Sequence, residues 1–356
     1  MNDKSIVFFS LCRMSVNEGG MARNFAVYQE FKDRDALVYN TESTSILNRM
    51  MMFFSWWWKL LNFENKKIVI TQVCFINIFF PISFFKYHFL ANIFKKLLIN
   101  VANRNSLYIE VNDLIYEQAI DLNIQVSSYA KRFQNMLFSL KGVHFIFASH
   151  KMSEFVIENY NCSKENTQVI VNGAPVFEEK ENVPAYITIP KDNINFIYAG
   201  TLSKGRQIED MISIFKKTPY NLFLMGIEGD WIKDMELKNV FYLGAFPEPI
   251  ALKITSMCDY GLIPYDESKH YFNLCYPTKV SFYLSAGLPL FSTPLKETIL
   301  ALKEYGELGI FVPLANWDIF LQSNIDIEKK ALLKMNVNSV RDKFTWKYIL
   351  SHLKLE

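Results

Sequence analysis

The feature that most constrains the fold is the alternation of short apolar, β-rich runs with helical patterns along the chain. In the first half, strands are predicted at residues 5–10, 36–39, 67–72, 106–111, 143–148 and 168–171. Helical patterns separate them at residues 19–31, 44–63, 84–102, 126–140 and 151–160. Such alternation predicts a parallel sheet covered by helices on both faces.

The alternation stops once, in residues 172–193, and then resumes. This segment holds Gly173, Pro175, Pro184 and Pro190 together with a charged patch, a composition typical of a linker. Beyond it, strands are predicted at residues 195–199, 221–225, 240–243, 260–264, 289–292 and 310–312, and the tail from 337 to 355 reads as a helix.

We therefore predict an α/β protein with two Rossmann-like domains that face each other across a cleft. The domains are expected at residues 1–172 and 194–336, with a linker at 173–193 and a C-terminal helix at 337–356 that can cross back to the first domain. A chain of 356 residues is too long for one ordinary core. Open parallel sheets bind ligands at the carboxyl ends of their strands, so the cleft is the expected site.

Charge and cysteine content exclude several classes of protein. The 38 basic and 36 acidic residues give a net charge of +2, too small to create a global field for nucleic acid. The five cysteines are scattered without zinc-ligand spacing, which indicates free thiols in a reducing compartment. The start of the chain reads as a strand rather than a signal peptide. We expect a cytoplasmic protein.

Residues 196–206 combine a strand end with a basic turn. The strand ends at Gly200 and Thr201, and the turn carries Lys204 and Arg206 before a helix begins. Backbone N–H groups at a helix start, with a cation beside them, form an anion site that suits a diphosphate. A solvated basic turn is the alternative.

A second basic position follows the strand predicted at 260–264. Tyr276, Pro277 and Lys279 lie at the start of a predicted helix, so Lys279 falls in its first turn. A cation there is unfavourable against the helix dipole, and a bound anion would offset this cost. A lysine pointing to solvent is the alternative.

Together these two segments resemble the C-terminal domain of the GT-B glycosyltransferases, in particular the retaining, family 4-like group. The resemblance spans about residues 196–293 and rests on Gly200-Thr-Leu, on Arg206 near the phosphate-binding lysine position, and on Pro277-Thr-Lys279 followed by YLSAGLP. It implies that the second domain binds the nucleotide sugar. Arg206 and Lys279 would neutralise the leaving diphosphate as catalytic residues, and Gly200, Thr201, Lys204, Tyr276 and Pro277 would contact the donor.

One departure from the family pattern concerns the ribose. Phe282 stands where many relatives carry a glutamate that holds the nucleotide ribose, and a phenyl ring cannot accept that hydrogen bond. The sequence is closer to a divergent branch that includes bacterial glucosyl- and galactofuranosyltransferases. Glu297 can take over a ribose or sugar contact, or it can be a helix N-terminal carboxylate favoured by the dipole.

In the first domain the resemblance points to a glycine loop and an acceptor side. Gly19 and Gly20 resemble the loop that approaches the donor. Glu110, Asn112 and Asp113 end a predicted strand and resemble the family's acceptor-side segment. Asp113 is the candidate to take a proton or hold an acceptor hydroxyl, or else it caps the next turn.

Three further features have competing interpretations. His150 follows a predicted strand and either contacts donor or acceptor or is structural. Asp33 and Asp35 have the spacing of a metal-binding DxD, but they lie between a helix and the next strand, so we expect a solvated loop, no metal and no cofactor. The aromatic, lysine-containing segments from Met50 to Trp58 and from Phe84 to Lys96 suit either a membrane interface or core helices with snorkelling lysines.

The sequence thus predicts a glycosyltransferase that moves a hexose-like unit from a UDP- or GDP-sugar to a glycan or glycolipid acceptor in bacterial surface polysaccharide or glycoprotein synthesis. Retention of configuration and independence of metal follow from the resemblance. A non-catalytic GT-B-fold partner subunit and a sugar-nucleotide epimerase are the alternatives.

Overall fold

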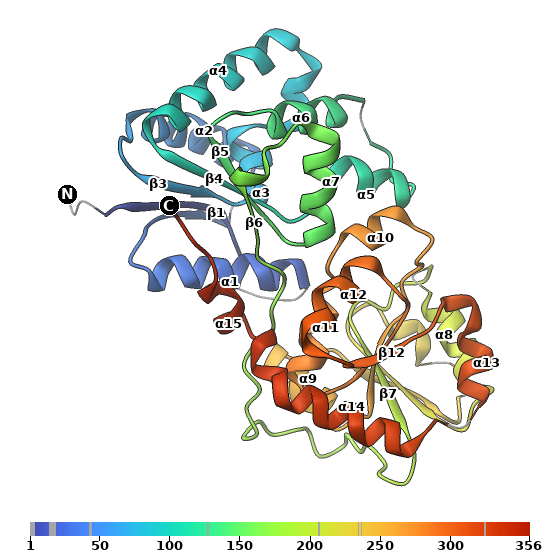
Figure 1. Cartoon of the computed structure of the whole chain (residues 1–356). Coiled ribbons are helices and arrows are strands. Elements are labelled where there is room, and N and C mark those ends of the chain that lie inside the picture. The colour runs from blue at the N-terminus through green and yellow to red at the C-terminus, as the bar shows by residue number, and fades with distance from the viewer. Residues whose placement is uncertain are drawn as a thin grey trace. The chain divides into compact units, whose positions relative to one another are not determined.

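The computed structural model describes residues 4–13, 19–42, 45–126, 128–205, 207–233, 235, 237–323 and 325–356. The chain divides into two compact units (Figure 1). Unit 1 holds the first strand, Gly20–Val171 and the tail His352–Glu356, and unit 2 is formed mainly by Asn172–Ser351.

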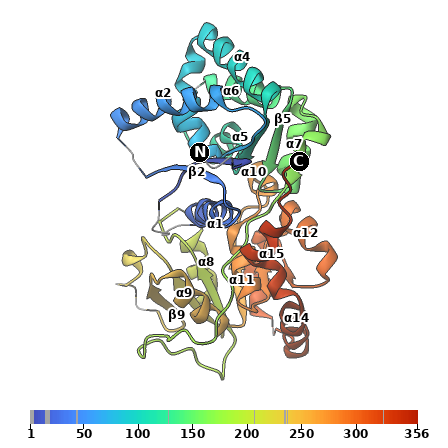
Figure 2. The ribbon, with the colours of Figure 1, turned by 90° about the vertical axis from the view of Figure 1, so that its left-hand side faces the viewer.

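Unit 1 is built on a six-stranded parallel sheet in the order β2-β1-β3-β4-β5-β6. The strands are β1 (Ile6–Leu11), β2 (Leu37–Thr41), β3 (Lys67–Ile70), β4 (Ser106–Val111), β5 (Val143–Phe147) and β6 (Thr167–Val169). The main helices are α1 (Gly19–Asp33), α2 (Ile46–Asn62), α4 (His88–Arg104), α5 (Ile115–Asp121), α6 (Ser128–Phe138) and α7 (His150–Tyr160). Figures 1 and 2 show α1 on one side of this sheet and α2 and α4 on the other.

Aromatic side chains cover both faces of β1. Phe8 stacks on Phe31 of α1 with ring centroids 4.4 Å apart, whereas Phe9 packs on Trp56 of α2 at 5.4 Å. Successive strand residues point to opposite faces of a sheet, so neighbouring phenylalanines contact helices on opposite sides. The continuous apolar run of β1 is therefore the signature of a strand buried on both faces.

The longest apolar stretch of the sequence, residues 73–85, is core rather than a surface element. It forms the short helix α3 (Gln72–Cys74), a π-helical turn (Phe75–Phe79) and a 3-10 turn (Ile82–Lys86). Phe75, Phe79 and Phe80 have no exposed surface, and Trp57 of α2 donates its indole N–H to the Phe79 carbonyl at 2.9 Å. No helix in the described part of the chain is long and apolar enough to cross a bilayer.

Unit 2 contains a second six-stranded parallel sheet, in the order β12-β11-β10-β7-β8-β9. Its strands are β7 (Asn195–Ala199), β8 (Asn221–Met225), β9 (Val240–Gly244), β10 (Tyr260–Ile263), β11 (Leu290–Ser292) and β12 (Gly309–Phe311). Its helices are α8 (Ile208–Phe215), α9 (Glu248–Ser256), α10 (His270–Leu274), α11 (Thr278–Ser285), α12 (Lys296–Leu302), α13 (Trp317–Gln322), α14 (Ile327–Val340) and α15 (Trp346–Ser351). The strand order reverses between β7 and β10, so the loops after these two strands border the crevice where such sheets bind ligands.

The predicted tail helix is interrupted in the structure. Helix α14 ends at Val340, a 3-10 turn covers Arg341–Phe344, and α15 runs from Trp346 to Ser351. The break arises because the Phe344 carbonyl accepts from Ala174 N at 3.0 Å and Trp346 N donates to the Ala174 carbonyl at 2.8 Å. A continuous helix would use those groups internally.

The last five residues are extended and belong to unit 1. Lys67 of β3 donates to the Leu355 carbonyl at 2.8 Å, and the hydroxyl of Tyr108 donates to the Glu356 carbonyl at 2.9 Å. The tail therefore crosses back as an extended segment rather than as a helix.

A close backbone approach ties the ends of β7 and β8 together. Gly226 has φ +150°, and a Cβ atom there would overlap the carbonyl oxygen of Gly200, which follows β7. Gly200 N in turn donates to the Met225 carbonyl at 2.9 Å. Only glycine fits between these two loops without moving them.

We predict that Gly226→Ala lowers the free energy of unfolding by about 2–4 kcal/mol, because backbone overlap adds to φ strain. Gly306 is the matched control, since its φ is +80° and its missing Cβ would meet open space. Gly306→Ala should cost only about 1–2 kcal/mol of strain. Urea unfolding of both variants measures the difference, and equal losses would show that the approach of the two loops is not constrained.

Candidate functional site

Lys279 lies beside the carboxyl ends of β7 and β10, where the strand order of unit 2 reverses. It is the second residue of α11, whose N-cap is Pro277. Its Nζ donates to the hydroxyl of Tyr265 at 3.3 Å and lies 5.4 Å from the centroid of the same ring. It also lies 5.0 Å from the ring centroid of Tyr198 on β7. Since Tyr265 follows β10, Lys279 joins the ends of the two central strands.

Gly200 brings the backbone after β7 against this lysine. A Cβ at Gly200 would lie 2.8 Å from Cε and 2.9 Å from Nζ of Lys279, and the φ of Gly200 is +153°. The main chain of the loop and the ammonium group are therefore in contact. Gly200 and Lys279, singled out separately in the sequence, meet in one place.

The half-buried Lys279 has no carboxylate within ion-pair distance among the described residues. Burial opposes its charge, but the surrounding hydroxyl oxygens of Tyr198, Tyr265 and Tyr283 outweigh this and raise the pKa above its ordinary value. The ammonium group thus stays protonated at neutral pH. Its positive charge is held in place but not neutralised, which is the electrostatic condition for binding an anion.

Tyr283 fixes the position of α11 against the sheet. Its hydroxyl accepts from Ala199 N at 2.9 Å and donates to the Leu262 carbonyl at 3.3 Å. Its ring occupies the space that a side chain at Gly261 of β10 would need. One tyrosine therefore sets the spacing of β7, β10 and the helix that carries Lys279.

The basic turn after β7 is anchored to the loop after β8. Leu202 N donates to the Ile227 carbonyl, and the Trp231 indole N–H donates to the Leu202 carbonyl at 2.7 Å. The exposed Lys204 lies over the Trp231 ring, 5.4 Å from its centroid. Arg206 is outside the described residues, and the structure does not test its predicted approach to Lys279.

The start of α8 carries negative charge of its own. The carboxylate of Glu209 accepts from Gly205 N at 3.0 and 3.1 Å, and Asp210 follows in the same turn. The Gly205 N–H, in the turn that precedes the helix, is therefore already used. Positive charge on the described part of this site comes from Lys279 and Lys204.

Tyr276 and Glu297 are interior residues. The Tyr276 hydroxyl lies 2.9 Å from the Ser281 hydroxyl, which donates to the Asn172 carbonyl, and the Asn172 amide donates to the Tyr276 carbonyl. This closed network makes Tyr276 a positioning residue for the start of α11. Glu297 is fully buried in the first turn of α12, and Phe282 is half-buried.

In unit 1, Glu110 takes part in a buried ion pair. Arg23 of α1 donates to the Glu110 carboxylate at 2.6 Å and to the Ile170 carbonyl at 2.7 Å, and both charged side chains are almost completely buried. Glu110 therefore joins α1 to the sheet. Gly19 and Gly20 open the same helix, and the residues just before them are outside the described part.

Asn112 and Asp113 are held by a residue that the sequence did not single out. The side-chain oxygen of Gln72 accepts from Asn112 N at 2.8 Å and from Asp113 N at 2.9 Å, and its amide donates to the Asp113 carbonyl at 2.6 Å. Both side chains are half-buried, and His150 is the exposed first residue of α7. These residues all follow β4 or β5 and lie at the carboxyl ends of their strands.

The DxD-like pair lies at the end of α1 and in the turn before β2. Asp33 ends α1, and Asp35 accepts from Lys4 at 2.7 Å with a φ of +55°. No group of three or more His, Cys, Asp or Glu residues in the described ranges is arranged to hold a metal ion.

Sequence reasoning missed the aromatic and amide residues that build the site. These are Tyr198, Tyr265, Tyr283, Trp231 and Gln72. The available signal was position, since Tyr198 lies near the end of β7, Tyr265 follows the end of β10 and Gln72 follows β3.

Comparison with solved structures identifies the fold. Sucrose-phosphate synthase from Thermosynechococcus elongatus superposes with a TM-score of 0.64 at 12% identity, covering 96% of each chain. WaaG, a glycosyltransferase involved in lipopolysaccharide biosynthesis, gives 0.61 at 12% identity over 97% of this chain and 99% of its own. Anabaena HepE in complex with UDP-glucose gives 0.61 at 13% identity over 97% of both chains.

The chain has the two-domain GT-B fold of glycosyltransferases, as its resemblance to the family 4-like group predicted. No protein-family model and no curated protein matches the sequence. The likeness is therefore one of architecture.

We predict that Glu110→Ala acts first on stability. It leaves the buried Arg23 without its carboxylate and should lower the free energy of unfolding by about 3–5 kcal/mol. Glu154, whose pair with Lys151 is exposed on α7, is the control, and Glu154→Ala should cost less than about 1 kcal/mol. Urea unfolding measures the free energy of unfolding of both variants. If the Glu110→Ala protein is as stable as the wild type, Glu110 is not needed for the fold and is again a candidate to contact the acceptor.

Proposed function

We propose that this protein is a glycosyltransferase that moves a sugar from a UDP- or GDP-sugar to a glycan or glycolipid acceptor. The observation that carries the proposal is Lys279, which has no carboxylate within ion-pair distance among the described residues and lies at the ends of β7 and β10 in unit 2. In this proposal unit 2 binds the donor and unit 1 the acceptor. HepE, with the same fold, is known in complex with UDP-glucose.

The proposed reaction breaks the bond between the anomeric carbon of the sugar and the diphosphate oxygen, which leaves with the electron pair. The anomeric carbon forms a new bond to an acceptor hydroxyl oxygen, and the hydroxyl proton is taken up by the leaving diphosphate or by Asp113. Negative charge grows on the diphosphate in the transition state, so a fixed ammonium beside it lowers the barrier. Lys279 has that role, with Lys204 and Arg206 contributing further positive charge.

The remaining donor contacts follow from position in the fold. Gly200 and Thr201 present backbone to the diphosphate, Pro277 starts the helix that carries Lys279, and Gly19 and Gly20 at the start of α1 contact the sugar. Asn112, Asp113 and His150 are the acceptor-side candidates. Glu297 is buried, so it can contact the ribose in place of the glutamate that Phe282 replaces only if the start of α12 moves. Glu110 joins α1 to the sheet through its ion pair with Arg23. We further propose retention of configuration without a metal, in the cytoplasm, in bacterial surface polysaccharide or glycoprotein synthesis.

Two alternatives to the transferase function remain, and Phe282 favours one of them. A phenyl ring in place of the ribose-binding glutamate fits a non-catalytic GT-B subunit that binds no nucleotide. A sugar-nucleotide epimerase would bind the nucleotide but react without an acceptor. Calorimetry with UDP, GDP and their sugars, followed by product analysis with and without acceptor, separates these three functions.

We predict that Lys279→Ala weakens nucleotide-sugar binding or turnover by about tenfold to a hundredfold, the loss of one charge-assisted contact. Tyr265→Phe keeps the ring but removes the 3.3 Å hydrogen bond to Nζ, and should cost only a few-fold.

Lys253 is the matched control, because its Nζ also lies over an aromatic ring in unit 2, 5.3 Å from the centroid of Phe177. Lys253→Ala should bind like the wild type in calorimetry and in thermal shift. Equal binding by the Lys279→Ala and Lys253→Ala proteins would remove Lys279 from the donor site.

A further inference from the structure

Helix α2 presents a row of large apolar side chains to solvent. Leu47, Met51, Phe54 and Trp58 are 67, 57, 68 and 74% exposed. Their spacing of three or four residues places them on one face of the helix. Ile46 and Met50 on the same helix are 72 and 54% exposed. Isolated exposed apolar residues need no explanation, but a continuous row of them marks an interaction surface.

The other side of α2 is fully packed, so the exposed row is not a sign of a loose helix. Trp56, Trp57 and Leu60 are buried, and Trp57 lies 5.4 Å from Phe94 of α4 between ring centroids. Phe53 contacts the same Phe94 at 5.7 Å. Three successive tryptophans are thus divided between core and surface, with Trp58 alone exposed.

Helix α4 extends this surface from the neighbouring position. Tyr87, Phe89 and Ile93 are 51, 63 and 50% exposed, and Ile93 directly precedes the Phe94 that packs on α2. Figure 2 shows α2 and α4 on the same side of the sheet of unit 1. We call the exposed apolar residues of these two segments the α2–α4 apolar face; they are Ile46, Leu47, Met50, Met51, Phe54, Trp58, Tyr87, Phe89 and Ile93.

The charged side chains on the two helices of this face have one sign. Neither α2 nor α4 contains an aspartate or glutamate, whereas Arg49 and Lys59 lie on α2 and Lys95 and Lys96 on α4. The exposed Lys86 immediately precedes Tyr87. Of the nearest acidic residues, Glu64 pairs with Arg104 and Glu42 lies beyond the N-terminal end of α2.

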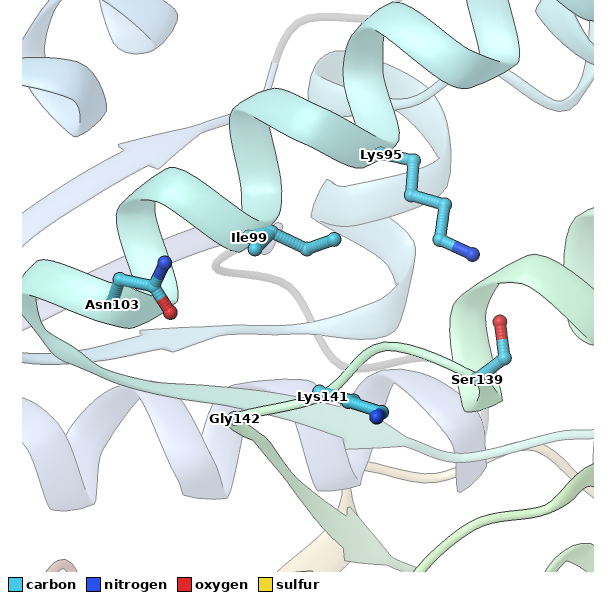
Figure 3. Close-up of a pocket in the computed structure, with 6 residues that line it drawn as sticks. All are labelled: Lys95, Ile99, Asn103, Ser139, Lys141 and Gly142. Atoms are coloured by element: carbon cyan, nitrogen blue, oxygen red, sulfur yellow. The ribbon is translucent and has the colours of Figure 1, made fainter.

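A basic hollow borders α4 as well. A cavity of about 430 Å³ is lined by Lys95, Ile99, Asn103, Ser139, Lys141 and Gly142. Figure 3 shows Lys95 reaching down from α4 toward Ser139, with Ile99 between Lys95 and Asn103 along the helix. Two lysines, a hydroxyl and an amide suit a phosphate group rather than an apolar ligand.

From these observations we propose that the α2–α4 apolar face docks on an anionic lipid bilayer. Aromatic and aliphatic side chains enter the headgroup boundary, and the surrounding lysines contact lipid phosphates. A second copy of the chain is the weaker occupant, because a two-fold contact would bring this basic surface against itself. Docking does not depend on the proposed transferase reaction and is measured without nucleotide or acceptor.

The test is flotation with vesicles of phosphatidylcholine containing about a third phosphatidylglycerol. The wild-type chain should float with these vesicles, bind pure phosphatidylcholine vesicles at least tenfold more weakly, and be released by high salt. The triple variant Leu47→Ser, Phe54→Ser, Trp58→Ser should lose at least tenfold in binding. Brominated lipid should quench tryptophan fluorescence in the wild type and much less in Trp58→Phe.

The matched control is Tyr186→Ser with Ile319→Ser, since these side chains in unit 2 are 74 and 70% exposed. This control should bind anionic vesicles like the wild type. Circular dichroism confirms that both variants are folded. Wild-type protein that stays off anionic vesicles, or a triple variant that binds them fully, overturns the proposal. So does a wild-type dimer that the triple variant converts to a monomer without any vesicle binding by either protein.

Discussion

The candidate site depends on a lysine ammonium held by aromatic side chains and main chain rather than by a carboxylate. Lys279 contacts Tyr198 from β7, Tyr265 after β10, and the backbone at Gly200. Tyrosine rings and hydroxyls orient a cation without cancelling its charge, whereas a carboxylate in an ion pair would neutralise that charge. The same arrangement requires β7 and β10 to end side by side, which is what the reversal of strand order provides.

The structure separates charges that build the fold from charges that are free to act. Glu110 lies at the carboxyl end of β4, where ligand-binding residues are expected, but its carboxylate forms a buried ion pair with Arg23. Asp259 at the start of β10 pairs with Lys330, which stabilises the opposite end of a strand. Lys279 has the reverse arrangement, since it lies close to three tyrosines and forms no ion pair with any carboxylate in the described part of the chain. A titratable residue near a sheet edge is thus informative only once its partners are known.

Aromatic residues serve two purposes in unit 1. Phe8, Phe9 and Phe79 fill both faces of the sheet, so most of the high phenylalanine content is core. The remaining aromatic surface is concentrated on α2 and at the start of α4, next to lysines. One helix serves both purposes because its 3.6-residue period turns Trp56 and Trp57 inward and leaves Trp58 outside.

The sequence by itself determined the alternation of strands and helices, because apolar periodicity is a local property; β7 and β8 begin and end where it placed them. The sequence also identified Gly200 and Lys279 as parts of the same family motif, because both lie in segments that resemble the C-terminal domain of GT-B glycosyltransferases. It did not determine that the C-terminal helix is interrupted before Thr345, that the Gln72 side chain hydrogen-bonds the backbone of Asn112 and Asp113, or that Glu110 forms an ion pair with Arg23. Each of these depends on residues far apart in the chain, from 40 positions between Gln72 and Asn112 to 172 positions between Ala174 and Trp346. Only tertiary structure brings such groups within hydrogen-bond distance, so only it decided which charges remain available for chemistry.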